Sequence, residues 1–176
     1  MVLFRRNRVP GGTYFFTVTL RDRSSDLLVA SIDRLRYAFQ TTRHERPFFV
    51  DAIVILPNHL HAIWTLPADD ADYAGRWRAL KSRFTHLLRF QGVPLQADAR
   101  GEYRRWQRRY WEHTIRDDED RQRHMDYIHY NPVKHGLVNR VADWPFSSFH
   151  RLVKRGWLPL DWAGGSIIDA PGDFGE

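Results

Sequence analysis

The chain has 176 residues, with 27 Lys or Arg against 21 Asp or Glu, a formal net charge of +6 and a pI near 10.0; this length suits one compact domain and is short for two. It contains no cysteine, which excludes disulfides and thiolate zinc sites, so a metal must be held by nitrogen and oxygen ligands. No apolar run approaches the ~20 residues that span a bilayer and the first residues lack a signal-peptide pattern, so we expect a soluble, cytoplasmic protein without a membrane partner.

The first predicted element is a β-strand over residues 13–20, which are rich in β-branched and aromatic side chains and follow a turn signal at residues 10–12. Residues 31–43 have apolar side chains at helical spacing. Ser31 is a suitable N-cap for this helix, and Pro47 stops it.

Residues 48–56 and 59–66 have strand patterns and are separated only by Pro57 and Asn58. A two-residue connection of turn-forming residues predicts a β-hairpin. The next segment, 73–90, has an apolar stripe at helical spacing and cations elsewhere around the axis, which predicts a basic helix.

Residues 92–105 lose the apolar pattern and are expected to form a mobile loop, after which a strand is expected over 108–115. A third helix follows, with Asp117 or Asp118 as its N-cap. We expect it to end near Asn131, because the next residue is a proline.

The predicted order of strand, helix, strand, strand, helix, strand is the split βαβ pattern of a ferredoxin-like α+β sandwich with an antiparallel sheet. A final short helix, capped by Ser147 and reaching Lys154, is appended to it. We expect one domain over 1–163 and a loosely ordered, glycine-rich tail over 164–176. The composition of this tail raises the hypothesis that it folds back over the active site.

The predicted second hairpin strand begins with His59 and His61. Side chains two residues apart in a strand leave the same face, so both imidazoles can reach one metal ion. This spacing indicates half of a metal site.

On the third helix, Tyr127 and Asn131 are four residues apart and project from one face. The amide oxygen of Asn131 is a ligand that hard divalent ions accept, and two imidazoles with one oxygen leave positions open for a phosphate. Tyr127 would then sit beside that phosphate.

The chain resembles the HUH-type single-tyrosine transposases, and in particular the REP-associated tyrosine transposases, over roughly residues 10 to 165. The segments that carry the resemblance are Gly11 to Phe16, His59-Leu60-His61, Trp111 to Arg116, Asp126 to Gly136 and Asp143 to Ser148.

The resemblance implies an HUH endonuclease fold and a metal-dependent endonuclease and strand transferase acting on single-stranded DNA with REP-type palindromic hairpins. It makes Tyr127 the nucleophile that forms a 5′-phosphotyrosine link, and His59, His61 and Asn131 the ligands of Mg²⁺ or Mn²⁺. Related transposases often place glutamine at the position of Asn131. Whether one subunit or a homodimer builds the site is left open.

Arginine is far more frequent than lysine, and its planar fork matches phosphate, which favours nucleic acid as the partner. The cations expected to bind DNA are Arg5, Arg6, Arg8, Arg78, Lys81, Arg83, Arg104, Arg105, Arg108 and Arg109. Tyr103 and Trp106, which lie among them, are candidates for stacking on unpaired bases.

Two other functions are considered. A binding protein that recognises hairpins without catalysis would not need a metal site and a phenol together. A metallohydrolase of the His-x-His-x-Asp-His type is disfavoured, because Ala62 and Ile63 follow His61. His124 and His129 are interpreted as exposed helical histidines, and the acidic cluster 117–120 as a helix cap.

Overall fold

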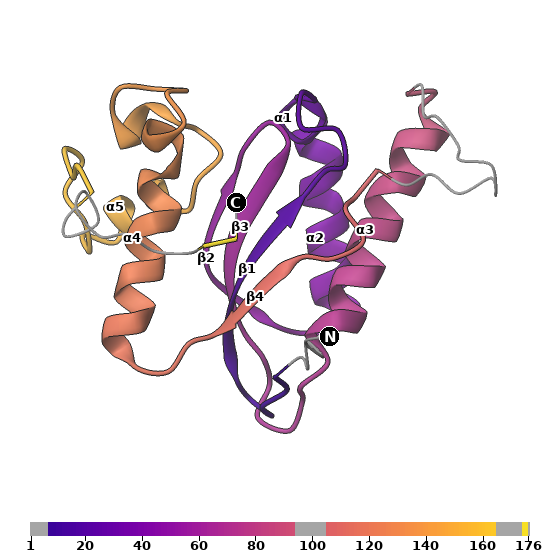
Figure 1. Ribbon diagram of the computed structural model, residues 1–176, viewed down its shortest axis with the longest axis horizontal. Helices are drawn as coiled ribbons and strands as arrows, with labels where there is room; N and C mark the ends of the chain where they lie inside the picture. Colours follow the sequence, from indigo (N-terminus) through magenta and orange to yellow (C-terminus); the bar gives the residue numbers. More distant parts are fainter. Residues whose placement is uncertain (1–6, 94–104, 165–173, 176) are drawn as a thin grey trace, which may run out of the picture.

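The computed structural model describes residues 7–93, 105–164 and 174–175, which form a four-stranded sheet with helices on both faces (Figure 1). The loop predicted over 92–105 and the tail predicted over 164–176 lie mostly outside these residues. In chain order the elements are β1 (Thr13–Thr19), α1 (Leu27–Ala30), α2 (Ile32–Glu45), β2 (Phe49–Ile55), β3 (His59–Thr65), α3 (Tyr73–Phe90), β4 (Trp111–Thr114), α4 (Asp118–Lys134), the 3₁₀ helix η1 (Val141–Asp143) and α5 (Phe149–Lys154).

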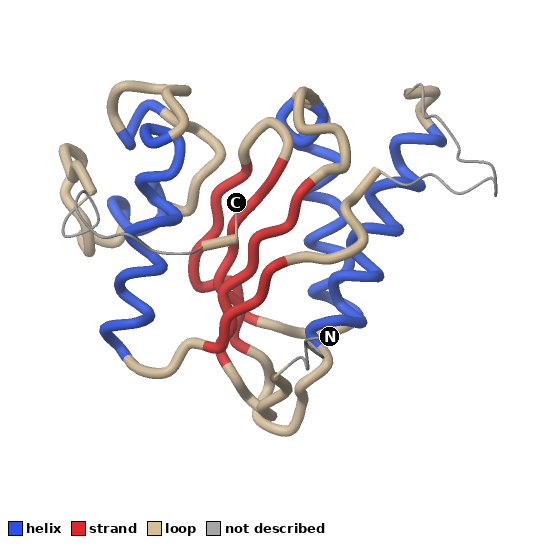
Figure 2. Tube along the Cα trace, viewed as in Figure 1, coloured by secondary structure: helices blue, strands red, loops and turns tan. Residues whose placement is uncertain are grey.

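The strands lie in the order β2-β3-β1-β4, and each pair is antiparallel. This order confirms the expected ferredoxin-like α+β fold with an antiparallel sheet (Figure 2). In the register of β1 with β3, Thr17 lies opposite His61 and Thr19 opposite His59. Both histidines are therefore on a central strand, with threonines of the other central strand as cross-strand neighbours.

Alternation along β1 divides the interior into two layers. Tyr14 and Phe16 point to the face covered by α2 and α3, whereas Phe15 belongs to the cluster on the α4 face (Figure 1). On the α2/α3 face, Trp64 and Trp77 are fully buried and stack with their ring centroids 4.0 Å apart. This larger aromatic layer packs against the α2/α3 face of the sheet, and the smaller layer on the α4 face contains the histidine pair.

Helix α4 is longer than the sequence predicted. It continues through Pro132 to Lys134, because a proline near the C-terminal end removes only one backbone donor and the bonds beyond it still form. His135 N donates to Asn131 O at 3.0 Å, and Gly136, with φ of 66°, takes the left-handed conformation that ends the helix. The extension places Lys134 on the same helix as Tyr127.

Strand β4 is shorter than the predicted 108–115, and the short helix α1 was not predicted at all. Between residue 105, where the described part of the chain resumes, and β4, the chain pairs with the sheet through an isolated bridge between Trp106 and Leu20. The predicted last helix is present as α5, but its N-cap is Ser148 and not the predicted Ser147, whose Oγ accepts a hydrogen bond from Phe149 N at 3.1 Å.

None of the described helices is long and apolar enough to cross a membrane.

Candidate active site

His59 and His61 point from β3 toward α4, and both are buried, with 4% and 0% of their surface exposed. Their ring centroids are 5.1 Å apart. The structure therefore brings the pair together on one face, as the i, i+2 spacing predicts.

The δ nitrogens of both histidines have neighbouring oxygens. His59 Nδ1 lies 2.7 Å from Asn58 Oδ1, an acceptor, so this nitrogen carries the proton. His61 Nδ1 lies 2.8 Å from Thr17 Oγ1, whose own proton is donated to Phe174 O at 2.5 Å, so His61 also donates from Nδ1. In both rings the lone pair is then on Nε2, the nitrogen that a metal would take.

Tyr127 lies beside this pair. Its ring centroid is 5.2 Å from that of His61, at an interplanar angle of 75°, and only 3% of the residue is exposed. Lys134 Nζ donates to the Tyr127 hydroxyl at 3.1 Å. The expected nucleophile is thus next to the expected ligands and has a cationic donor on its reacting oxygen.

Asn131, the expected third ligand, is fully buried on α4 one turn after Tyr127. His135, which the sequence analysis did not single out, lies at the end of the same helix with its ring centroid 5.1 Å from that of His59. Spacing is the signal that was missed: Lys134 and His135 are seven and eight residues after Tyr127, which is about two turns along one helix face.

The end of the chain covers the tyrosine. Phe174 stacks on Tyr127 with ring centroids 3.7 Å apart and an interplanar angle of 15°, and it also packs against Phe15 and His124. Its backbone oxygen accepts the hydrogen bond from Thr17. The described part of the tail therefore contacts both Tyr127, the expected nucleophile, and Thr17, which bonds to His61.

A second group, formed by His113, Asp120 and His124, lies at the start of α4. Its possible ligand atoms are all within 4.8 Å of one another, so it could hold a metal ion. Asp120 is already bonded on both oxygens: Oδ2 accepts from His113 Nε2 at 2.7 Å, and Oδ1 accepts from Arg123 at 3.1 Å. Burial alone would raise the pKa of Asp120, but the bonds from His113, the Arg116 backbone and Arg123 outweigh burial and hold it far below its usual range.

One sequence interpretation in this region was wrong, and another was incomplete. His124 and His129 are buried, at 5% and 1% exposure, and not exposed helical residues, because α4 packs one side on the sheet and another on α5. Burial, followed by the charge of Arg151, lowers the pKa of His129 to about 4. Asp117 does cap α4 by accepting from Asp120 N, but Asp120 itself is a buried anchor between α4 and β4.

The expected DNA-binding cations of helix α3 lie away from Tyr127 (Figure 1). Helix α3, with Arg78, Lys81 and Arg83, covers the opposite face of the sheet (Figure 1). Lys81 lies over the ring of Trp106, which is buried and so not open for base stacking, and Arg83 pairs with Glu45. The exposed cations of the predicted set are Arg8, Arg78, Arg108 and Arg109, and Arg105 is half-buried. The predicted residues outside the described part of the chain are Arg5, Arg6, Tyr103 and Arg104.

Comparison with known proteins gives consistent matches. The chain is 48% identical over 161 residues to the REP-associated tyrosine transposase of Escherichia coli (strain K12), covering 92% of this chain and 90% of that protein. It is 46% identical over 174 residues to a Haemophilus influenzae protein provisionally given the same description, covering 97% and 98%. A solved structure of the REP-associated tyrosine transposase bound to a REP hairpin superimposes with a TM-score of 0.87 at 47% identity, covering 100% and 98%. A scan against models of protein families found no match.

The sandwich fold, the paired histidines facing a helical tyrosine and these likenesses define a tyrosine transposase. More narrowly, the chain belongs to the REP-associated tyrosine transposases.

Proposed function

We propose that the protein is a metal-dependent endonuclease and strand transferase that cleaves single-stranded DNA carrying REP-type hairpins through a 5′-phosphotyrosine intermediate on Tyr127. The observation that supports this proposal best is the set of groups around the Tyr127 side chain. Tyr127 has the Lys134 ammonium on its oxygen and the His61 ring 5.2 Å from its own, and Phe174 stacks on its ring. A purely binding role needs none of these contacts.

In the proposed reaction the Tyr127 oxygen attacks a backbone phosphorus. The new bond joins this oxygen to phosphorus, the bond from phosphorus to the 3′ oxygen breaks, and the 3′ oxygen takes a proton to leave a free hydroxyl. Lys134 favours the deprotonated phenol because an ammonium stabilises an adjacent oxyanion. The tyrosine ester keeps the energy of the phosphodiester, so a later 3′ hydroxyl can reverse the step without a nucleotide cofactor.

The metal-binding residues in this proposal are His59, His61 and Asn131. The fit rests on the chemistry of the donor set: hydrogen bonds at Nδ1 of both imidazoles put the ring lone pair on Nε2, the atom that binds a cation, and Asn131 adds a neutral oxygen from α4. When bound, Mg²⁺ or Mn²⁺ would polarise the phosphate and offset charge in the transition state. The group at Asp120 is the less favourable site, since two guanidinium groups already compensate its carboxylate.

The solved relative is bound to a REP hairpin, and we propose the same class of ligand for this chain. Phosphate contacts are assigned to the cations predicted from the sequence, including Arg8, Arg78, Arg108 and Arg109. One chain carries both histidines and the tyrosine, so we propose that a monomer has a complete site. Because chromosomal repeats are the proposed substrate, we place the protein at the nucleoid.

The test uses hairpin oligonucleotides taken from the DNA around the gene, labelled on either side of the hairpin and incubated with protein and Mn²⁺ or Mg²⁺. We expect a denaturant-resistant adduct that carries the label 3′ to the cut, because the 5′ phosphate is the group bound to tyrosine. Tyr127→Phe should abolish the adduct and keep hairpin binding, while Tyr130→Phe, three residues away on α4, serves as the matched control. An adduct that persists in Tyr127→Phe would refute the assignment.

The alternative is a catalytically silent hairpin-binding protein. Membership of the transposase family and the contacts of Tyr127 disfavour it. Tight hairpin binding with no nick under either metal, also after removal of the tail, would favour it over the proposal.

A further inference from the structure

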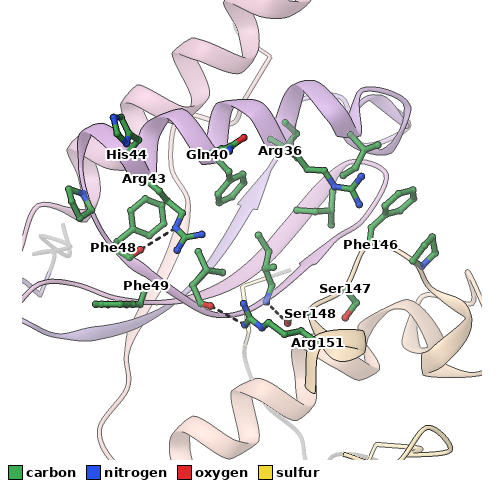
Figure 3. A pocket seen from close by; sticks show the side chains of 18 residues that line it. Arg36, Gln40, Arg43, His44, Phe48, Phe49, Phe146, Ser147, Ser148 and Arg151 are labelled. Carbon is green, nitrogen blue, oxygen red and sulfur yellow. Dashed lines mark hydrogen bonds between the residues drawn. The ribbon is translucent and has the colours of Figure 1, made fainter. Parts of the chain in front are cut away.

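A groove of about 700 Å³ runs along the β2 edge of the sheet, between α2 and the segment that leads into α5 (Figure 3). Helix α2 forms one wall, and residues 145–148 with Arg151 form the other. Its floor is apolar and includes Ile53 of β2 and Phe39 of α2. The groove is therefore a preformed concave surface outside the candidate active site.

The groove is lined with cations from both walls. Arg36 and Arg43 project from α2 and Arg151 from α5, and none of the described residues that line it is Asp or Glu (Figure 3). Burial, followed by the nearby charge of Arg155, lowers the pKa of Arg151; Asp51 opposes this change, and Arg43 makes a smaller contribution that also lowers it. Three arginines with no carboxylate among the described lining residues give the groove a positive charge that complements a polyanion.

The guanidinium groups are held in place by backbone oxygens. Arg43 Nε donates to Phe48 O at 3.3 Å, and Arg151 Nη2 donates to Val50 O at 3.0 Å and Asp51 O at 2.6 Å. A guanidinium has five N–H donors, so these bonds fix each group by one edge and leave capacity for a phosphate.

Aromatic rings lie between these charges. Phe49 is 66% exposed at the rim, which is unusual for a strand phenylalanine, and Phe146 lies on the opposite wall with the Arg36 guanidinium carbon 5.9 Å from its ring centroid. Proteins that bind single strands stack unpaired bases on aromatic rings and guanidinium planes, and place cations nearby for the phosphates. An apolar peptide would gain nothing from the three arginines.

We propose that this groove binds the unpaired nucleotides next to the hairpin, with bases stacked on Phe49 and Phe146 and phosphates on Arg43 and Arg151. This inference rests on the proposed function, since the ligand is the single strand that Tyr127 would process. The two sites are close in the chain: Ile55, at one end of the groove, pairs with Leu60, the residue between the two histidines. A DNA strand leaving the groove would pass around this end of the β2–β3 hairpin to reach α4.

The test compares a blunt REP-type hairpin with the same hairpin carrying a single-stranded extension, by fluorescence anisotropy with EDTA present so that no cleavage occurs. We expect Phe49→Ala to weaken binding of the extended hairpin by about tenfold and to leave the blunt hairpin unchanged. The matched aromatic control is Phe90→Ala, which alters a phenylalanine 84% exposed on α3 and should change neither affinity.

A second pair of variants tests the charge without removing packing. Gln40 lines the groove, so Gln40→Glu should weaken binding of the extended hairpin and Gln40→Lys should strengthen it, each more strongly at low salt. Gln91→Glu, away from the groove beside Arg34, is the control and should have no effect.

Equal effects on blunt and extended hairpins, or no effect on either, would overturn the proposal. A second copy of the chain as the occupant would appear in sedimentation as a dimer that Phe49→Ala dissociates, and this would also overturn it. Because binding is measured without metal, failure of the groove is distinguishable from failure of the adduct assay at Tyr127.

Discussion

Lys134 Nζ lies 3.1 Å from the Tyr127 hydroxyl oxygen and 4.8 Å from the centre of the tyrosine ring, two turns further along α4. This contact exists because the helix does not stop at Pro132. A proline that ended the helix would have separated the ammonium from the phenol, so the local backbone decides the electrostatics of the proposed nucleophile.

Replacing Lys134 by Met should slow adduct formation by about tenfold, because a charged donor to the phenolate is lost from a partly exposed position. Hairpin affinity should change little, since the ammonium is directed at Tyr127. The rates are measured as single-turnover adduct formation. Lys134→Arg should retain part of the rate, and Lys154→Met on α5 is the control. An unchanged rate in Lys134→Met would remove the lysine from the mechanism.

Removing the aromatic ring at the chain end should accelerate adduct formation. Phe174 is stacked on Tyr127 and is only 8% exposed, so Phe174→Ala uncovers the ring that must approach the phosphate. A chain shortened after Ala163 should behave in the same way. Trp157→Ala, an exposed aromatic on a neighbouring loop, is the control. Slower cleavage by both altered chains would mean that the tail assists the reaction.

Mixing two inactive variants tests whether one chain builds the site. His61→Gln and Tyr127→Phe each remove a group that the structure places in the same chain, 5.2 Å apart by ring centroids. We expect no adduct from the mixture at any ratio, and a wild-type rate per molecule that is independent of protein concentration. Recovery of activity on mixing would show that a helix from a second subunit completes the site.

Metal binding can be assigned to one of the two histidine groups by thermal melting with and without Mn²⁺. We expect Mn²⁺ to raise the melting temperature of the wild type and of His113→Gln, and not that of His61→Gln, because ligands that bind only the folded state stabilise it. The opposite pattern would move the metal to the Asp120 group.

Stability should fall in mild acid because of buried His129. Its folded pKa is about 4 and the unfolded value is near 6.5, so below about pH 6.5 the unfolded chain takes up a proton that the folded chain does not. The contribution of His129 to the free energy of unfolding should decrease by roughly 2 kcal/mol between pH 7 and pH 5 and level off below pH 4. Urea titrations of His129→Gln should show a flatter dependence, and His86→Gln, exposed on α3, should keep it. A wild-type stability independent of pH would contradict this prediction.

The periodicity of apolar residues in the sequence predicts most of the fold. The hairpin at Pro57 and Asn58 and helix α3 appear where the patterns of period two and 3.6 predict them, and the sheet order follows from their sequence. The sequence predicts too early an end for α4. Pro132 alone indicates a helix stop, and the tertiary contacts that keep α4 on the sheet are not visible in the sequence.

The site was predicted only in part, for a physical reason. His59, His61 and Tyr127 follow from local spacing and a family resemblance. Thr17 bonds to His61 across the sheet, and Phe174 bonds to Thr17 from the chain end, at separations of 44 and 157 residues that no local pattern encodes. The buried state of Asp120 was missed likewise, since a capping aspartate and an anchoring one look the same in sequence.

The segment just before α5 determines how short a soluble version of this chain can be. Ser148 N donates to Ile53 O and Phe146 O accepts from Ile55 N, both at 2.8 Å, so this segment satisfies backbone groups on the outer side of β2. A version cut at the end of α4 would keep every proposed catalytic group and yet leave that strand open to pairing with other copies, a recognised route to aggregation. Minimal versions intended for biophysical work should therefore extend past Leu152.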